Sequence, residues 1–305
     1  MSFTLPIELA AAHAVDTVPN GDGWSYEPKM DGWRGAASRS ALFSRAGRSL
    51  TTRFPDIVAA VAELGDVVLD GEIVAYQSGR LNFAALQHSP QHRAKAGVTV
   101  YFLAFDLLEH YGIDTRSQPY HHRRALLNEI LSTGGHGLVQ PVPATTERAD
   151  ALKWLDPPWA AVGIEGVVAK PRSAPYIAGR RSGWRKTRTR TTTEAVVLGV
   201  TATSLVLGLP ARSGRWRPAG ITQPLRPDLA HELTSRLHAS GNPAQLQSTV
   251  AGLPGNTDEI WYQPTAIDTV VEIEVDGAYE FGRWRHRPKL VRVRGDLVPS
   301  DLVAR

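Results

Sequence analysis

Short apolar runs alternate with helix-spaced apolar positions through the first 190 residues. Runs rich in β-branched and aromatic residues predict buried strands at 67–76, 98–108 and 164–170. Apolar residues on one helical face predict helices over 54–64, around 126–131, and after the start signal at 145–147. Because helices do not separate the strands regularly enough for βαβ repeats, this region is predicted to be an α+β domain with antiparallel sheet.

The pattern changes after Arg190. Short strands are predicted over 194–200, 204–209, 214–220, 259–263, 269–275 and 289–295, with one helix over 228–238. Several short strands with a single interposed helix indicate a small barrel, for which the OB-fold is the leading candidate. We therefore expect two domains, 1–190 and 191–305.

Composition restricts the class of protein. The chain has 305 residues, 42% of them apolar and 21% charged, as is typical of a soluble globular protein. No apolar run approaches the roughly 20 residues of a membrane span, and no basic segment precedes the short apolar run at the N-terminus, so a secretory signal is not expected. Cysteine is absent, which rules out disulfides, thiolate catalysis and cysteine-bound zinc, and fits a cytoplasmic location.

Positive charge is concentrated in two segments, although the net charge is only +4. Eight basic residues and no acidic one lie between Glu165 and Glu194, and six more, again without an acid, lie from Arg283 to Arg294. Such clusters favour contact with a polyanion. The alternative is a solvated surface that pairs with acids elsewhere in the chain.

The segment EPKMDGWR, residues 27–34, places Lys29 two residues before an Asp-Gly turn. The turn alone could be an ordinary solvated hairpin. The spacing K-x-D-G-x-R also suits a nucleophile, because lysine must lose a proton to attack phosphorus and its ordinary pKa is about 10.4. A cation such as Arg34 and burial of the turn would both favour the neutral amine. We therefore interpret Lys29 as a candidate nucleophile, with Arg34 available to ribose or phosphate oxygens.

This segment resembles motif I of the covalent nucleotidyltransferases, the superfamily of DNA ligases, RNA ligases and mRNA capping enzymes. Later segments resemble the superfamily's other motifs in order: Phe43-Ser44-Arg45, Asp70-Gly71-Glu72, Phe105-Asp106, Glu165-Gly166-Val167-Val168 and Trp184-Arg185-Lys186-Thr187-Arg188. Each could be a plain turn or buried strand, so the interpretation depends on their joint order. The sequence resembles bacterial ATP-dependent DNA ligases, especially the small C-type ligases, in its chain length and in the segments AFDLL, EGVVAKP and, near the N-terminus, LPIELAAA.

The resemblance implies an adenylation (nucleotidyltransferase) domain, ATP-grasp-like, followed by an OB-fold domain. In it, Lys29 would form lysyl-AMP from ATP, Glu27 would read the adenine amino group, and Phe105 would stack on the base. Glu72 would hold the ribose, and Glu165, with help from Glu72, would bind Mg²⁺ or Mn²⁺. The other residues implied to bind the nucleotide are Arg34, Arg45, Lys186 and Arg188.

The implied reaction seals nicks in duplex DNA for DNA repair. AMP would pass from the lysine to the 5′-phosphate of the nick, and the adjoining 3′-hydroxyl would displace it. DNA contacts should fall on phosphates, and the candidates are Arg283, Arg285, Arg287, Arg292 and Arg294. The first three would share one face if that segment is extended. We expect a monomer that acts on nicked duplex DNA in the cytoplasm, at the nucleoid, with other repair proteins as potential partners and no membrane.

The last family motif, R-x-D-K, reads Arg294-Gly295-Asp296-Leu297 here. In the family this segment orients the departing pyrophosphate, and leucine has no charge with which to do so. We therefore predict slow self-adenylation, or assistance from Arg292 or Lys289. Two alternatives stay open: an RNA ligase or guanylyltransferase that shares Lys29, and a DNA-binding scaffold with a degenerate nucleotide pocket.

Overall fold

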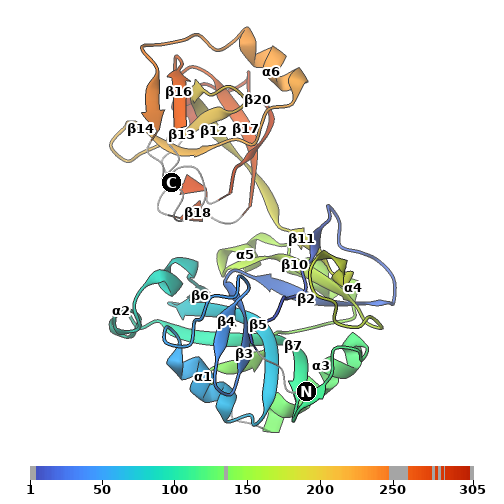
Figure 1. Ribbon diagram of the computed structural model, residues 1–305. Helices are drawn as coiled ribbons and strands as arrows, with labels where there is room; N and C mark the ends of the chain where they lie inside the picture. The colour runs from blue at the N-terminus through green and yellow to red at the C-terminus, as the bar shows by residue number, and fades with distance from the viewer. Residues whose placement is uncertain are drawn as a thin grey trace. The chain divides into compact units, whose positions relative to one another are not determined.

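A computed structural model describes residues 5–133, 137–246, 260–276, 279–280, 283–284 and 286–302. The chain forms two compact units, Met1–Thr189 (unit 1) and Arg190–Arg305 (unit 2) (Figure 1). Each unit is described by itself. No helix within the described ranges is long and apolar enough to cross a membrane.

The larger sheet of unit 1 has the strand order β4-β3-β5-β7-β8, with β6 and β9 added to β5 and β7. Its strands are β3 (Trp33–Ser38), β4 (Leu42–Ser44), β5 (Val67–Gln77), β6 (Arg80–Leu81), β7 (Thr99–His110), β8 (Ile113–Asp114) and β9 (Val139–Pro141). The central strands β5 and β7 are two of the predicted apolar runs. Strands β5 and β7 pair antiparallel, and among the described strands of this sheet β9 is the one that joins its neighbour in parallel.

A second sheet has the order β1-β11-β10-β2. It contains β1 (His13–Ala14), β2 (Trp24–Met30), β10 (Ile164–Pro171) and β11 (Arg185–Arg188). Strands β2 and β3 are separated only by Asp31 and Gly32, yet they belong to different sheets, so this turn does not close a hairpin. A Cβ atom on Gly32 would lie 2.3 Å from the carbonyl oxygen of Ile73, so the crossing between sheets requires glycine here.

Helices α1 and α3 pack apolar residues on the larger sheet. Helix α1 (Pro55–Ala62) begins with proline at its first turn and buries Ile57 and Val61. Helix α3 (Tyr120–Thr133) contributes Leu127 to the same core. The remaining helices are η1 (Phe83–Gln87), α2 (Pro90–Lys95), α4 (Arg148–Lys153), α5 (Pro157–Ala161) and η2 (Arg180–Ser182).

Unit 2 is a curved antiparallel sheet in which the long strand β12 pairs with β13, β16 and β17. Its elements are β12 (Arg190–Val200), β13 (Leu205–Pro210), β14 (Trp216–Ile221), α6 (Pro227–Thr234), β15 (Ala244–Leu246), β16 (Ile260–Pro264), β17 (Val270–Asp276), β18 (Tyr279–Glu280), β19 (Arg283–Trp284), β20 (Lys289–Val293) and η4 (Pro299–Asp301). Each strand and the helix predicted after residue 190 has a counterpart here. Threonines 191–193 are part of β12 and pair with β17.

Candidate nucleotide-binding site

Unit 1 contains a pocket of about 580 Å³ lined by side chains from both of its sheets. The predicted residues that line it are Glu27, Lys29, Arg34, Arg45, Glu72, Phe105, Lys186 and Arg188. Glu165 is not in the lining, but it is ion-paired with Lys29. The structure therefore brings together side chains that lie up to about 160 positions apart in the sequence.

Strand register explains how β2, β10 and β11 form one wall. Lys29 pairs with Gly166, which pairs with Arg188 on the next strand. Two positions along, Glu27 is opposite Val168, which is opposite Lys186. Since alternate residues of a strand point to one face, these two rows place Glu27, Lys29, Lys186 and Arg188 in the same pocket.

A β-bulge brings Glu165 to Lys29. The register of β2 and β10 shifts between Ile164 and Gly166, so Glu165 is the extra residue of β10. Bulges change the direction of a side chain, and here the carboxylate of Glu165 accepts a hydrogen bond from the Lys29 ammonium. Gly166 has φ of +148°, and a Cβ there would lie 2.0 Å from the Thr187 carbonyl oxygen. The glycine of the EGVV motif is therefore required by the backbone.

Arg34 is held by protein groups on the opposite wall. Its Nε and Nη2 donate to Asp70 at 3.1 and 2.6 Å, and its Nη1 donates to the carbonyl oxygen of Ala10. Its guanidinium carbon lies 5.2 Å from the ring centroids of both Phe105 and Trp184. Arg34 thus supports the aromatic side chains of the pocket, and three of its nitrogens donate to Asp70 and Ala10. Its contact with ribose or phosphate oxygens stays a prediction.

Glu27 is also surrounded by donors. Lys170 Nζ lies 2.8 Å from one of its carboxylate oxygens, and the Tyr120 hydroxyl donates to the other. Arg124 Nη1 is 3.6 Å away. The ammonium of Lys170 is 4.2 Å from the centroids of the Phe105 and Trp184 rings, and its burial lowers the pKa of Lys170 despite the Glu27 charge. Sequence reasoning missed Lys170 and Tyr120; the buried ending of the EGVVAK run was the only signal for Lys170.

Two ionisable groups near Lys29 have perturbed acidities. Burial raises the pKa of the Glu72 carboxyl to about 7, although Lys29 and Arg34 act in the opposite direction. The pKa of Lys186 is lowered, first by burial and then by the positive charges of Arg188, Lys29 and Arg45. Perturbed acidities of this kind in a pocket are typical of functional sites.

The carboxylates of Glu165 and Glu72 fit a hard divalent cation whose other ligands are phosphate oxygens and water. Within the described residues no group of three or more His, Cys, Asp or Glu side chains could hold a metal. Glu165 is ion-paired with Lys29, and the positive charge of Lys29 lowers the pKa of Glu72 against the larger effect of burial. Mg²⁺ is commonly bound by one or two carboxylates together with phosphate oxygens and water, and this donor set matches that habit.

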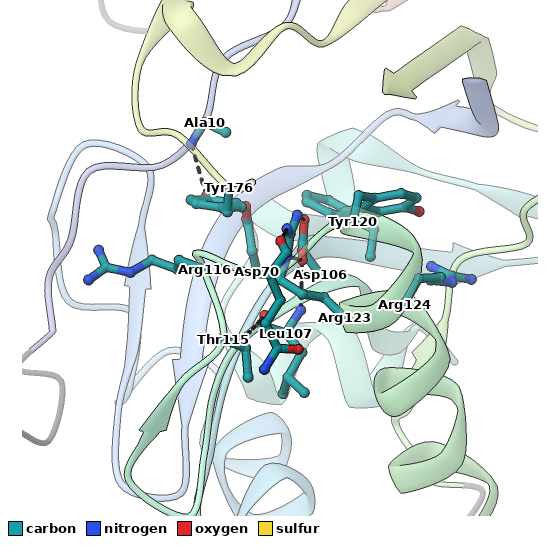
Figure 2. Close-up of polar contacts among 12 residues, drawn as sticks. Ala10, Asp70, Asp106, Leu107, Thr115, Arg116, Tyr120, Arg123, Arg124 and Tyr176 are labelled. Atoms are coloured by element: carbon teal, nitrogen blue, oxygen red, sulfur yellow. Dashed lines mark hydrogen bonds and ion pairs between the residues drawn. The ribbon is translucent and has the colours of Figure 1, made fainter. Parts of the chain in front are cut away.

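A buried polar network lies behind the aromatic wall (Figure 2). Asp70 and Asp106 are directly opposite each other on β5 and β7 and are both fully buried. Each is paired with an arginine: Arg34 with Asp70, and Arg123 with Asp106 through bonds of 2.7 and 2.9 Å. The Tyr176 hydroxyl donates to Asp70 at 2.6 Å and accepts from the backbone N–H of Ala10 at 2.9 Å. These charges are compensated in pairs, as buried charges must be.

In unit 2, the predicted DNA-binding arginines differ in their surroundings. Arg292 is paired with Glu272 at 2.6 Å, and Arg294 is paired with both Glu194 and Asp296 at 2.8 Å. Arg285 lies outside the described residues. Arg283 lies in β19 (Arg283–Trp284) and Arg287 lies outside the described strands. Because Arg285 between them is not described, the shared face expected for 283–287 stays a prediction.

Leu297, where the family has lysine, packs at the edge of an apolar cluster of unit 2 with Leu302, Trp216 and Tyr262. Its neighbours Arg294 and Asp296 form a bidentate pair, which lowers the pKa of Asp296 to about 2. The leucine is therefore accommodated by packing.

A lysine beside two carboxylates, with basic side chains on one wall and an aromatic wall opposite, is an arrangement typical of enzymes that bind a nucleotide and act on its phosphates. A family model described as ATP dependent DNA ligase domain matches residues 9–188. DNA ligase C of Mycobacterium tuberculosis is 30% identical, over 97% of this chain and 92% of that protein. DNA ligase C2 of Mycolicibacterium smegmatis is 30% identical, over 95% and 91%.

Solved structures of DNA ligases are also similar to this chain. The ligase domain of M. tuberculosis LigD is similar with a TM-score of 0.53 and 26% identity, over 97% of this chain and 98% of that one. A Lig E DNA ligase shares the fold with a TM-score of 0.56 at 17% identity, over 95% and 100%. The chain belongs to the ATP-dependent DNA ligase family and is an ATP-dependent DNA ligase. The predicted fold class and the resemblance to C-type ligases are confirmed.

Proposed function

We propose that this ligase seals nicks in duplex DNA through a lysyl-AMP intermediate on Lys29. The observation that carries the proposal is the Lys29–Glu165 ion pair beside the aligned side chains of Lys186 and Arg188. Lys29 contacts a carboxylate and shares its row of the sheet with Arg188, and Lys186 lies two positions along on the same face. That arrangement suits attack on a phosphorus atom whose oxygens are held by positive charge.

The three steps use this chain's own groups as follows. The Lys29 amine attacks the α-phosphate of ATP, forms an N–P bond and loses a proton, and pyrophosphate leaves. AMP then passes to the 5′-phosphate of a nick, which releases the amine. The adjoining 3′-hydroxyl attacks that phosphate and AMP leaves. Lys186 and Arg188 hold phosphate oxygens throughout, while Phe105 and Glu27 hold the adenine.

Glu165 and Glu72 would hold a divalent cation, Mg²⁺ or Mn²⁺. When bound, it would neutralise charge on phosphate oxygens and compete with the Lys29 ammonium for the Glu165 carboxylate. We further propose that the protein acts as a monomer and that it serves DNA repair; the repair role is supported by the name of a relative, the multifunctional non-homologous end joining DNA repair protein LigD of M. tuberculosis.

The test is intact mass of the protein after incubation with ATP and Mg²⁺. We expect a gain of one AMP on the Lys29 peptide, absent in Lys29→Ala and retained in Lys153→Ala, which removes an exposed lysine paired with Asp150. An adduct from GTP alone would contradict the proposal, and so would nick sealing by Lys29→Ala. Sealing of a nicked RNA duplex in preference to DNA would favour the RNA ligase alternative.

A further inference from the structure

A second positively charged region of unit 1 lies outside the pocket. From Ile73 to Phe105 the sequence contains no Asp or Glu, but it contains Arg80, Arg93 and Lys95. The structure places Arg80 in β6 and the other two in α2, with η1 between these elements. We call residues 80–95 the β6–α2 lobe; α2 lies at the left of unit 1 in Figure 1. Arg80 and Lys95 are exposed.

Two arginines fasten the lobe to the body of unit 1 through backbone carbonyls. Arg53, which precedes α1, donates to the carbonyl oxygen of Leu86 at 2.9 and 3.2 Å. Arg93 donates to the carbonyl oxygens of His88 and Arg53, at 2.6 and 2.8 Å. Carbonyl groups satisfy the guanidinium donors but carry no net charge, so both positive charges persist.

No carboxylate among the described residues lies within ion-pairing distance of Arg53, Arg80, Arg93 or Lys95. Asp56 is the acid that acts on Arg93, and its effect on the pKa of Arg93 is smaller than those of burial and of Arg53. The lobe therefore presents uncompensated positive charge. In contrast, Arg292 and Arg294, which were predicted from the sequence to bind DNA, are paired with acids.

The lobe is connected directly to the Lys29 end of the pocket. The backbone N–H of Leu81 in β6 donates to the carbonyl oxygen of Val162 at 2.9 Å. The next residue, Gly163, accepts a bond from the N–H of Asp31 at 3.3 Å and leads into the bulge at Glu165. The Leu81 end of the lobe is therefore adjacent to the segment that leads to Glu165 and Lys29, so a polyanion bound at this end would lie next to the proposed site.

We infer that the β6–α2 lobe is a docking surface for the phosphate backbone of duplex DNA next to the nick, with Arg80 and Lys95 as its exposed phosphate contacts. The inference rests on the proposed nick-sealing function and adds a surface to it. Unpaired cations that neutralise phosphates release counterions, which gives affinity without sequence preference, as a nick sealer requires.

The experiment compares the double variant Arg80→Ala/Lys95→Ala with the full-length wild type. Its matched control is Arg116→Ala/Lys153→Ala, which makes the same change in net charge at exposed unit 1 residues paired with Asp114 and Asp150. Binding of a nicked duplex is measured by fluorescence anisotropy across a salt series. Adduct formation with ATP alone is measured by intact mass.

We expect the lobe variant to bind nicked duplex at least roughly tenfold more weakly at 0.1 M salt, with the slope of log K against log[salt] reduced by roughly 1 to 2. The control should bind within about twofold of wild type, and AMP adduct formation should be unchanged in both. Equal affinities of the lobe variant and the control would overturn the inference. Absence of an adduct in the wild type would instead refute the proposed chemistry, and the binding data would still decide on the lobe.

Discussion

Removal of one hydroxyl should destabilise unit 1 measurably. In Tyr176→Phe, Asp70 loses a hydrogen bond of 2.6 Å and the N–H of Ala10 loses its 2.9 Å acceptor. A hydrogen bond to a charged group contributes about 2 kcal/mol, and a stranded buried N–H costs about 1 kcal/mol more. Arg34 still binds both oxygens of Asp70, so the carboxylate is not left without a partner. The expected loss is about 3 kcal/mol.

Urea unfolding followed by tryptophan fluorescence measures this loss, since the Trp184 ring packs 5.8 Å from that of Tyr176 and phenylalanine preserves the contact. Tyr111→Phe is the matched control, because Tyr111 is 66% exposed; it should change the free energy of unfolding by less than about 0.5 kcal/mol. A loss below about 1 kcal/mol in Tyr176→Phe would show that the Ala10–Tyr176–Asp70 chain contributes little, and the reasoning would be refuted.

Three further predictions concern the pocket and unit 2. The pKa of Glu72 is about 7, so the ionised fraction of this carboxyl grows roughly tenfold between pH 6 and 8. The rate of AMP adduct formation in wild type, divided by the rate in Glu72→Gln, should therefore rise roughly tenfold over that range. A ratio that does not change with pH would contradict a role for the Glu72 carboxylate in adduct formation. Lys170→Met leaves the buried Glu27 carboxylate without its nearest cation and should cost about 3 kcal/mol in urea unfolding, partly recovered when Glu27→Gln is added. Leu297→Lys should lower the free energy of unfolding of unit 2 by about 1 kcal/mol, because half-buried apolar surface is lost. The measurement is the Tm, which should fall; an unchanged Tm would argue against the packing of Leu297 on the apolar cluster of unit 2.

Strands and helices with strong periodicity were predictable from the sequence. The runs that became β5, β7 and β10 are apolar and β-branched, and α1 has its apolar positions on one face. Short or polar elements were not: β11 reads Arg-Lys-Thr-Arg and forms a strand only because β10 and β1 pair with it. Here tertiary pairing decides the structure, and local preference gives no signal.

The nucleotide-binding site was likewise predictable only in part. Motif order identified the residues that line the pocket, but not how they are held. The Asp-Gly turn after Lys29 suggested a hairpin, whereas the chain passes between sheets there. Arg34 was predicted to bind ribose or phosphate, and it is held by Asp70 and stacked between Phe105 and Trp184. Pairings between residues more than a hundred positions apart leave no mark in local periodicity, so Glu27's contact with Lys170 could not be foreseen.

The pairing of β2 with β10 has a consequence for the order of assembly during synthesis. Strand β2 carries Lys29, and its neighbour in the sheet is β10, which begins at Ile164. Strand β1 pairs with β11, which is synthesised later than β10. A nascent chain therefore exposes Lys29, the proposed nucleophile, early, but strand β2 has no partner strand until most of unit 1 has left the ribosome. Incomplete translation products that end before Ile164 would carry Lys29 without Glu165, Lys186 and Arg188.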